Sequence, residues 1–170
     1  RDQWEGGHRV PFIARWPGKI LPGSTAAQTI CLTDLLATMA AITGFKLPNS
    51  AGEDSFNILP ALLGSKKSVR EYTLHQTISL ALAIRHGDWK YLDHRGSGGN
   101  NYDRGGEWGM KQFALPEKVP TASGQLYNLK TDPGETTNLY LKEPNRAETL
   151  KAKLEEFKRT GRSTPKTNRP

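Results

Sequence analysis

Two short apolar runs separated by only two residues constrain the fold of this chain more than any other feature. Residues 80–86 and 89–93 are the two runs, and Gly-Asp joins them. A two-residue loop that opens with glycine predicts a β-hairpin, because glycine supplies the positive φ that primed turns require. The register of this hairpin sets Arg85 opposite Lys90, and like charges that face each other across a ladder repel. We expect both side chains to be long enough to splay into water, which preserves the hairpin.

The first half of the chain predicts one strand and two helices. Residues 10–16 form a short apolar run between a Gly pair and a Pro-Gly pair, which indicates a buried strand. Leucine and methionine recur at helical spacing over residues 33–42, and Gly44 ends that helix. A second, shorter helix is predicted over residues 55–63.

The second half predicts more strands and a closing helix. Residues 71–77 and 125–129 indicate strands, and residues 132–135 a type II turn with Pro second and Gly third. A final helix begins near Pro144. Its apolar stripe consists of Ala147, Leu150, Leu154 and Phe157. This order predicts an α/β fold that ends in a small antiparallel sheet covered by a C-terminal helix.

The same patterns predict the domain organisation. Residues 1–66 are expected to be the end of an α/β domain, and residues 67–160 a C-terminal subdomain. A glycine-rich loop covers residues 95–124 of that subdomain, and loops of this length are functional or mobile. Residues 161–170 are expected to be a disordered tail.

The positive charge of the chain is concentrated at its end. Of the formal net charge of +7, residues 151–170 supply +5, with seven Lys or Arg against two Glu. A nucleic-acid surface interleaves basic and aromatic residues on a folded face, so we expect no nucleic-acid partner. No stretch approaches the about 18 apolar residues that span a bilayer, so we expect no membrane partner.

The residues taken by themselves contain no complete active site. Cys31 lies on the apolar approach to a helix and is expected to be a buried small hydrophobe rather than a nucleophile. The four histidines show no i, i+4 spacing and no His-Glu-x-x-His motif. We therefore predict neither a catalytic residue nor a metal site within this chain.

Five sequence blocks nevertheless resemble one family. Residues 5–18, Glu-Gly-Gly-His-Arg-Val-Pro-Phe-Ile-Ala-Arg-Trp-Pro-Gly, resemble the Glu-Gly-Gly-x-Arg-x-Pro…Trp-Pro-Gly signature of arylsulfatase-type sulfatases. Four further blocks follow in that family's order: Thr-Asp-Leu-Leu at 33–36, Leu-Pro-Ala-Leu-Leu-Gly at 59–64, Ala-Ile-Arg-His-Gly-Asp-Trp-Lys at 83–90, and Leu-Tyr-Asn-Leu-Lys-Thr-Asp-Pro-Gly-Glu at 126–135.

The resemblance implies the C-terminal part of an alkaline-phosphatase-like sulfatase that hydrolyses aryl or carbohydrate sulfate esters. It also implies a formylglycine nucleophile and a calcium ion. The family's metal ligands and catalytic lysine precede its Glu-Gly-Gly, so we expect calcium to be bound by upstream residues. Cys31 is followed by Leu-Thr-Asp-Leu and does not match the modification motif Cys-x-Pro-x-Arg. We expect the fragment alone to be inactive, its partner to be the missing N-terminal part, and its location to be periplasmic or secreted.

A few residues are candidates for contact with a sulfated small molecule or glycan. Polar and aromatic groups on a long loop can meet a sugar or aryl ring. The substrate-pocket candidates are His75, His94, Asn100, Asn101 and Trp108. Glu5 and Arg9 flank the Gly pair and are expected to be structural, with Arg9 anchoring the turn through charged hydrogen bonds. His8 occupies a variable position of the signature and receives no role.

Two other functions remain open. The same fold could hydrolyse phosphate or phosphonate esters, or the chain could bind sulfated glycans without catalysis through its basic tail and long loop. Residues 10–16 and 33–42 need a larger sheet to pack against, so the isolated fragment is expected to self-associate.

Overall fold

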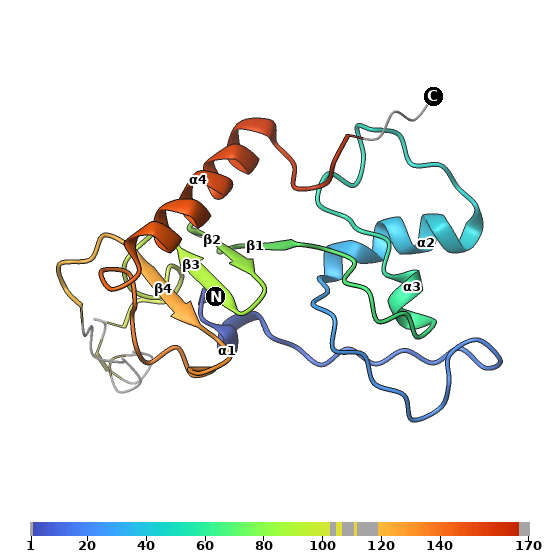
Figure 1. Cartoon of the computed structure of the whole chain (residues 1–170), viewed down its shortest axis with the longest axis horizontal. Helices are drawn as coiled ribbons and strands as arrows, with labels where there is room; N and C mark the ends of the chain where they lie inside the picture. The colour runs from blue at the N-terminus through green and yellow to red at the C-terminus, as the bar shows by residue number, and fades with distance from the viewer. Residues whose placement is uncertain (1, 103–104, 107–110, 112–118, 167–170) are drawn as a thin grey trace. The chain divides into compact units, whose positions relative to one another are not determined.

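Two compact units divide the chain. The computed structural model describes residues 2–102, 105–106, 111 and 119–166 (Figure 1). Unit 1 comprises Arg1–Val10 and Leu74–Glu155, and unit 2 comprises Pro11–Thr73 and Glu156–Pro170. The division after Thr73 differs from the one we expected after residue 66, and the N-terminal residues belong with the sheet.

A four-stranded sheet lies at the centre of unit 1. Its strands follow one another in chain order: β1 Tyr72–Gln76, β2 Leu82–His86, β3 Trp89–Leu92 and β4 Gln125–Asn128. The antiparallel pairing of β2 with β3 confirms the hairpin, and Arg85 lies opposite Lys90 as the register predicted. Strand β4 pairs antiparallel with β3.

Both faces of this sheet are buried, and different segments cover them. Because side chains alternate along a strand, the register groups Ala83, Leu92 and Tyr127 on one face. Trp4, from the N-terminal segment, packs against this group. Residues 2–8 therefore form a cover for the sheet that the sequence patterns did not predict.

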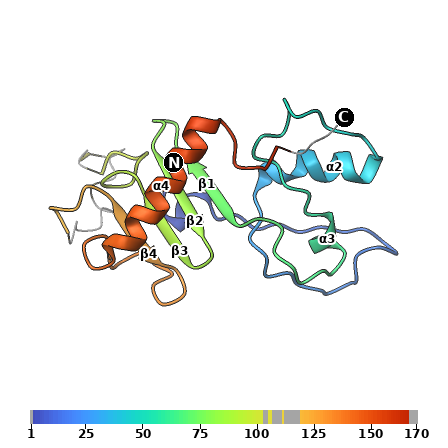
Figure 2. The same cartoon turned by 45° about the horizontal axis from the view of Figure 1, so that its top comes forward.

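Helix α4, Pro144–Thr160, lies across the opposite face (Figures 1 and 2). The Arg146 guanidinium stacks 4.1 Å from the ring centroid of Trp89 on β3. The predicted apolar stripe is confirmed, since its four residues are buried: Ala147, Leu150, Leu154 and Phe157. Full burial of such leucine and phenylalanine side chains contributes roughly 1.5–3 kcal/mol each.

Unit 2 is built around helix α2, Leu35–Thr43, which follows the 3₁₀ turn Leu32–Asp34. Gly44 ends α2 with a φ of 72°, as predicted. The helix expected over residues 55–63 is reduced to the four residues of α3, Leu59–Leu62. The amides of Phe56 and Ile58 donate to side chains of residues 34 and 38, so they are not free to continue a helix.

Three further expectations differ from the structure. Residues 10–16 form no strand, and Ile13 is 91% exposed. The turn over residues 132–135 exists, but Glu135 rather than Gly134 has the positive φ, so it is not type II. Cys31 is only half-buried.

Part of the segment that we expected to be disordered makes contacts within unit 2. The Ser163 amide donates to the Asp54 carboxylate at 2.8 Å, and the Thr164 hydroxyl donates to the Glu53 carbonyl at 2.7 Å. Among the described residues, no helix is both long and apolar enough to cross a membrane.

Candidate functional site

A buried lysine organises the covered face of the sheet. Lys90 on β3 is fully buried, and its Nζ lies 3.1 Å from Glu5 Oε1, 2.9 Å from Glu135 Oε1 and 3.0 Å from His8 Nε2. The ammonium donates a hydrogen bond to Glu5 Oε1 and forms an ion pair with the Glu135 carboxylate. Burial of a charge is tolerable when it is paired in this way. We call Glu5, His8, Arg85, Lys90 and Glu135 the charge cluster.

The cluster resolves the like-charge conflict of the hairpin. Glu5 belongs to the short helix α1, Glu5–His8, and its Oε2 lies 3.4 Å from Nη1 of Arg85. One carboxylate therefore bridges the two cations that face each other across the ladder. The expectation that both would splay into water is wrong for Lys90, and Arg85 keeps 25% of its side chain exposed.

Glu135 reaches the cluster from the turn that follows β4. Its φ of 53° is uncommon for a residue with a side chain. The carboxylate accepts a hydrogen bond from the Glu5 amide and pairs with Lys90. Burial raises the pKa of Glu135, while the Lys90 ammonium opposes that rise. The strained backbone thus places an acid where α1 and β3 both need one.

Two histidines complete this region. The rings of His8 and His75 stack with centroids 3.9 Å apart. Burial lowers the pKa of His8, and the neighbouring Lys90 ammonium lowers it further. The same Nε2 that lies 3.0 Å from Lys90 Nζ also lies 3.1 Å from the Gln3 carbonyl oxygen, so the tautomer of His8 decides which of the two is its hydrogen-bond partner.

The described residues do not fit a calcium ion. Glu5, His8 and His75 offer ligand atoms within 4.8 Å of one another. Calcium takes six to eight oxygen ligands, whereas this group supplies one carboxylate and two imidazoles. The Lys90 ammonium also contacts the carboxylate and one imidazole, and a second cation there would be repelled.

Arg9 plays a smaller part than expected. Its backbone N–H donates to the Glu5 carbonyl at 2.9 Å and closes α1. The side chain is exposed and makes no hydrogen bond to any residue that the structure describes. The backbone, and not the predicted charged hydrogen bonds, anchors this turn.

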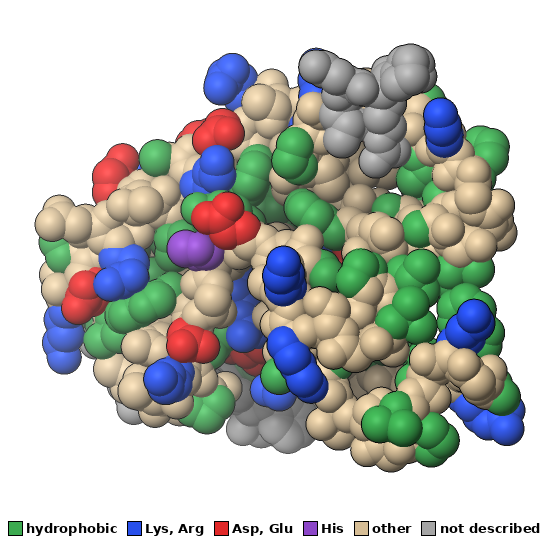
Figure 3. All heavy atoms as spheres, turned by 45° about the vertical axis from the view of Figure 1, so that its right-hand side comes forward, with side chains coloured by type: hydrophobic (Ala, Val, Ile, Leu, Met, Phe, Trp, Pro, Cys, Tyr) green, Lys and Arg blue, Asp and Glu red, His purple; other side chains and the backbone are tan. Residues whose placement is uncertain are grey.

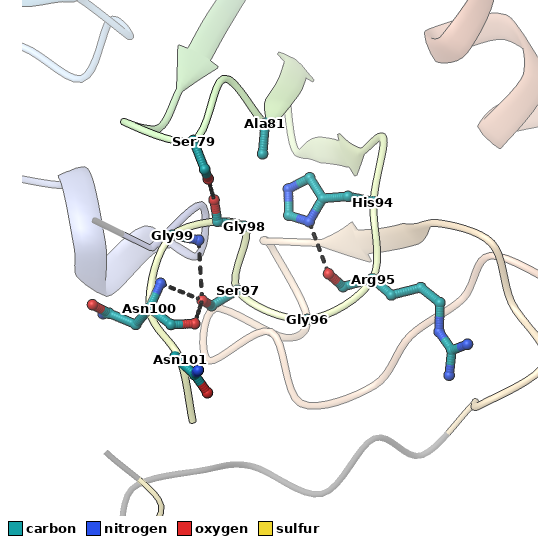
Figure 4. Close-up of a pocket in the computed structure, with 10 residues that line it drawn as sticks. All are labelled: Ser79, Ala81, His94, Arg95, Gly96, Ser97, Gly98, Gly99, Asn100 and Asn101. Atoms are coloured by element: carbon teal, nitrogen blue, oxygen red, sulfur yellow. Dashed lines mark hydrogen bonds between the residues drawn. The ribbon is translucent and has the colours of Figure 1, made fainter. Parts of the chain in front are cut away.

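An open pocket of about 370 Å³ lies in unit 1 (Figure 4). Its wall consists of Ser79, Ala81 and residues 94–101. Three predicted candidates, His94, Asn100 and Asn101, therefore share one pocket. His75 lies instead in the stack with His8, and Trp108 falls outside the described residues. Sequence reasoning missed Arg95, which adds an exposed cation to this pocket.

Buried glutamines hold the pocket loop in place. Gln125 on β4 is 2% exposed, and its Nε2 donates to the carbonyls of His94 and Gly96 at 3.0 and 2.7 Å. The Gln3 amide donates to the Ser97 carbonyl at 2.8 Å, and its side chain donates to the Ala81 carbonyl. The sheet and the N-terminal segment thus fix the backbone of the pocket.

The pocket side chains differ in what they can still bind. Asn100 donates its Nδ2 to the Asp2 carboxylate at 2.7 Å, which makes it an anchor of the loop. His94 contacts the Arg95 carbonyl through Nδ1 at 3.1 Å, and its Nε2 is buried without a hydrogen-bond partner among the described residues. Figure 4 shows the His94 ring on the side of the loop that faces Ser79 and Ala81. Arg95 is therefore the exposed charged group of this loop, and Figure 4 shows its side chain directed away from the other labelled residues.

Several known proteins are similar to this chain in sequence. No family model matches the chain. N-acetylgalactosamine-6-O-sulfatase from Bacteroides thetaiotaomicron is 34% identical over 155 residues, which are 91% of this chain and 28% of that protein. Human arylsulfatase A is 34% identical over 142 residues, which are 80% of this chain and 27% of that protein.

Solved structures are also similar to this chain. A protein from work on glycosaminoglycan metabolism by Bacteroides thetaiotaomicron has a TM-score of 0.69 and 31% identity, over 91% of this chain and 30% of that one. A protein solved with its substrate D-glucosamine-2-N,6-O-disulfate has a TM-score of 0.56 at 20% identity, over 85% of this chain and 27% of that one, and shows the fold alone.

The chain spans less than a third of the length of these relatives, and the matched stretch is a C-terminal part of them. The expected fold class is confirmed, with an α/β sulfatase C-terminal part that contains a four-stranded sheet and a C-terminal helix. The chain belongs to the sulfatase family.

Proposed function

We propose that this chain is the C-terminal part of an enzyme that hydrolyses sulfate esters of aryl compounds or carbohydrates. The observation that carries the proposal is the similarity to sulfatases over 91% of the chain at 34% identity. The names of these relatives favour sulfate over phosphate or phosphonate as the ester that is cleaved.

The nucleophile and the metal are assigned to residues outside this chain. The described residues do not fit calcium. The half-buried Cys31 is not followed by the remaining residues of the Cys-x-Pro-x-Arg motif. We therefore propose that residues upstream of this chain supply the formylglycine and bind the calcium ion. We expect the 170-residue chain alone to be inactive. We also propose a periplasmic or secreted location.

The pocket lined by residues 94–101 is proposed to select the substrate. A guanidinium such as that of Arg95 presents planar donors that match the oxygens of an anion. Such groups on an ordered loop suit a sulfated small molecule or glycan. The charge cluster holds helix α1 against the sheet. Gln3, which holds the pocket loop, lies directly before α1 in the chain.

The test uses the complete polypeptide encoded by the gene, produced together with a formylglycine-generating enzyme. We expect release of sulfate from aryl or hexosamine sulfates, and none from the 170-residue chain. Turnover by the isolated chain, or faster cleavage of the matched phosphate esters than of the sulfates, would contradict the assignment.

The pocket is tested by Arg95→Ala and His94→Ala in the same polypeptide. Loss of a charged hydrogen bond costs about 1.5–3 kcal/mol, so KM for a sulfated sugar should rise roughly 10- to 100-fold. Lys130→Ala, at an exposed residue of the turn after β4, is the control and should leave KM unchanged. An unchanged KM in both pocket variants would remove the pocket from the proposal.

The non-enzymatic alternative has its own test. If the basic tail and loop bind sulfated glycans, deletion of residues 151–170 abolishes a salt-sensitive interaction with a sulfated polysaccharide. Binding that survives the deletion, or that survives high salt, excludes this alternative.

A further inference from the structure

The carboxylate of Asp2 holds the end of the pocket loop at two residues. Its Oδ1 accepts a hydrogen bond from Asn100 Nδ2 at 2.7 Å, and its Oδ2 accepts one from the Tyr102 hydroxyl at 2.7 Å. Hydrogen bonds to an ionised acceptor are stronger than neutral ones. Burial raises the pKa of Tyr102, and the hydrogen bond to Asp2 raises it further, so the hydroxyl keeps the proton that it donates. Each oxygen of one carboxylate thus anchors a different residue.

Asn101 lies between these two anchors. Its side chain is exposed and belongs to the wall of the pocket. On the other side of it in the loop, the Gly98 carbonyl accepts a hydrogen bond from the Thr77 hydroxyl at 2.6 Å and another from the Ser79 hydroxyl (Figure 4). The loop is therefore fixed both before and after Asn101. The amide of this side chain offers donors and an acceptor, which suit the hydroxyl groups of a sugar.

The position of Asp2 is itself fixed by the segment that covers the sheet. A Cβ at Gly7 would lie 2.3 Å from the Asp2 carbonyl oxygen, so α1 packs directly on the backbone of Asp2. The Trp4 indole donates to Gln125 Oε1 at 3.1 Å, and its ring centroid lies 5.9 Å from that of Tyr102. The carboxylate is thus held in place before any ligand binds, which lowers the entropy lost on binding.

The charges on the visible surface do not offer a competing site. On the face that Figure 3 shows, the described Lys and Arg side chains are dispersed among acidic and uncharged ones rather than gathered in one patch. A surface of one charge sign is what concentrates an oppositely charged ligand. Discrimination between sulfated ligands is therefore expected from a few polar groups held in fixed positions in the pocket.

We propose that Asp2 is a positioning residue of the substrate pocket, which acts through Asn100 and Tyr102 to fix Asn101 where its amide binds a hydroxyl group of a sulfated sugar. Asp2 does not belong to the pocket wall and is assigned no contact with the substrate. The inference rests on the proposed function, because it takes this pocket as the place that selects the substrate.

Steady-state kinetics of the complete polypeptide, produced with a formylglycine-generating enzyme, test the proposal on a hexosamine sulfate and on 4-nitrophenyl sulfate. A neutral hydrogen bond lost at Asn101 predicts that Asn101→Ala raises KM for the hexosamine sulfate roughly 2- to 10-fold. Asp2→Ala should raise it by the same factor and leave kcat within about twofold. Neither variant should change KM for 4-nitrophenyl sulfate, which has no hydroxyl group for the amide to bind. Because both residues act through one contact, the double variant should show no further increase.

Two further variants give the matched comparison. Tyr102→Phe removes one anchor and should raise KM for the hexosamine sulfate about twofold or more. Tyr140→Phe removes a hydroxyl that lies 2.9 Å from the Ser123 hydroxyl, outside the pocket wall, and should change nothing. Asp2→Asn should restore KM to within about twofold of wild type, because its amide can accept from the Tyr102 hydroxyl and donate to a rotated Asn100 amide.

Three results would overturn the proposal. The first is an unchanged KM for the hexosamine sulfate in Asp2→Ala. The second is a further rise of KM in the double variant, since Asp2 would then act independently of Asn101. The third is an equal fall of kcat on both substrates with KM unchanged, since that pattern reports loss of folded enzyme and not of a substrate contact.

Hydrogen exchange of the same polypeptides separates this proposal from the proposed function. Asp2→Ala should speed exchange of the amides of residues 96–102 on the order of 10-fold, because the loop opens more often without its charged anchor, and Tyr140→Phe should not. If the wild type cleaves neither ester, the proposed function fails. Faster exchange in Asp2→Ala would then support its hold on the loop, and unchanged exchange would refute it.

Discussion

Replacement of Lys90 by methionine tests the central role of the charge cluster. Methionine fills much of the space of the lysine stem but removes the ammonium. Glu5 and Glu135 then lose their common cation, at positions where their side chains are 10% and 2% exposed. His8 loses a polar contact of its Nε2 as well. The substitution therefore leaves two carboxylates in a poorly hydrated space, with Arg85 and the His8 imidazole beside Glu5.

The expected loss of stability is large for a single substitution that changes the side-chain volume little. Removing one partner of a buried ion pair costs about 3–5 kcal/mol, because the remaining charge is uncompensated. Arg85 still lies 3.4 Å from Glu5, which favours the lower end of that range. We therefore expect Lys90→Met to lower the free energy of unfolding by about 3 kcal/mol.

Urea unfolding followed by tryptophan fluorescence measures this loss, since Trp4 and Trp89 lie in unit 1. Lys130→Met is the control and should change stability by less than about 0.5 kcal/mol. Adding Glu135→Gln to Lys90→Met removes one orphaned charge and keeps an acceptor for the Glu5 amide, so it should recover at least about 1 kcal/mol. A loss below about 1 kcal/mol in Lys90→Met, or no recovery in the double variant, would refute the reasoning.

Three other substitutions probe the remaining features. Because the pKa of His8 in the folded chain is lowered below 6.5, the unfolded chain binds a proton at this residue at a higher pH than the folded chain does. The contribution of His8 to the stability of the folded chain is therefore complete above pH 6.5 and is lost as the pH falls below it. His8→Gln should remove this pH dependence from the urea midpoints of unfolding. A Cβ at Gly98 would lie 2.5 Å from the His94 ring, so Gly98→Ala should raise KM in the complete polypeptide more than Gly96→Ala, which shares the positive φ but meets nothing within 4 Å. Asp34→Ala should lower thermal stability by about 3–5 kcal/mol, measured by calorimetry, because it leaves the Arg70 guanidinium buried without its carboxylate.

Local signals predicted the elements whose formation depends on neighbours in sequence. The Gly87-Asp88 turn placed the β2–β3 hairpin in its observed register. The stripe of α4 is buried as its spacing required, and Gly44 ends α2. Each of these depends on turn chemistry or on helical periodicity, which a short window of sequence contains.

The candidate site was predictable only in part. His94, Asn100 and Asn101 are close in sequence, so a single loop brings them to one pocket. Lys90 and Glu135 are 45 positions apart, and neither has a local feature that indicates burial. The Arg85–Lys90 pair across the hairpin marked a conflict of like charges, but we expected both side chains to splay into water, whereas Glu5 bridges them.

The sequence by itself determined the family, the hairpin and the amphipathic closing helix, because motif order and periodicity are properties of neighbouring residues. Only the tertiary structure decided that Glu5 and Glu135 meet at Lys90, that residues 10–16 remain unpaired, and that the apolar side of α2 faces outward. Strand pairing and charge burial depend on which distant segments come together, and those contacts are set by the free energy of the whole packed chain rather than by any one segment.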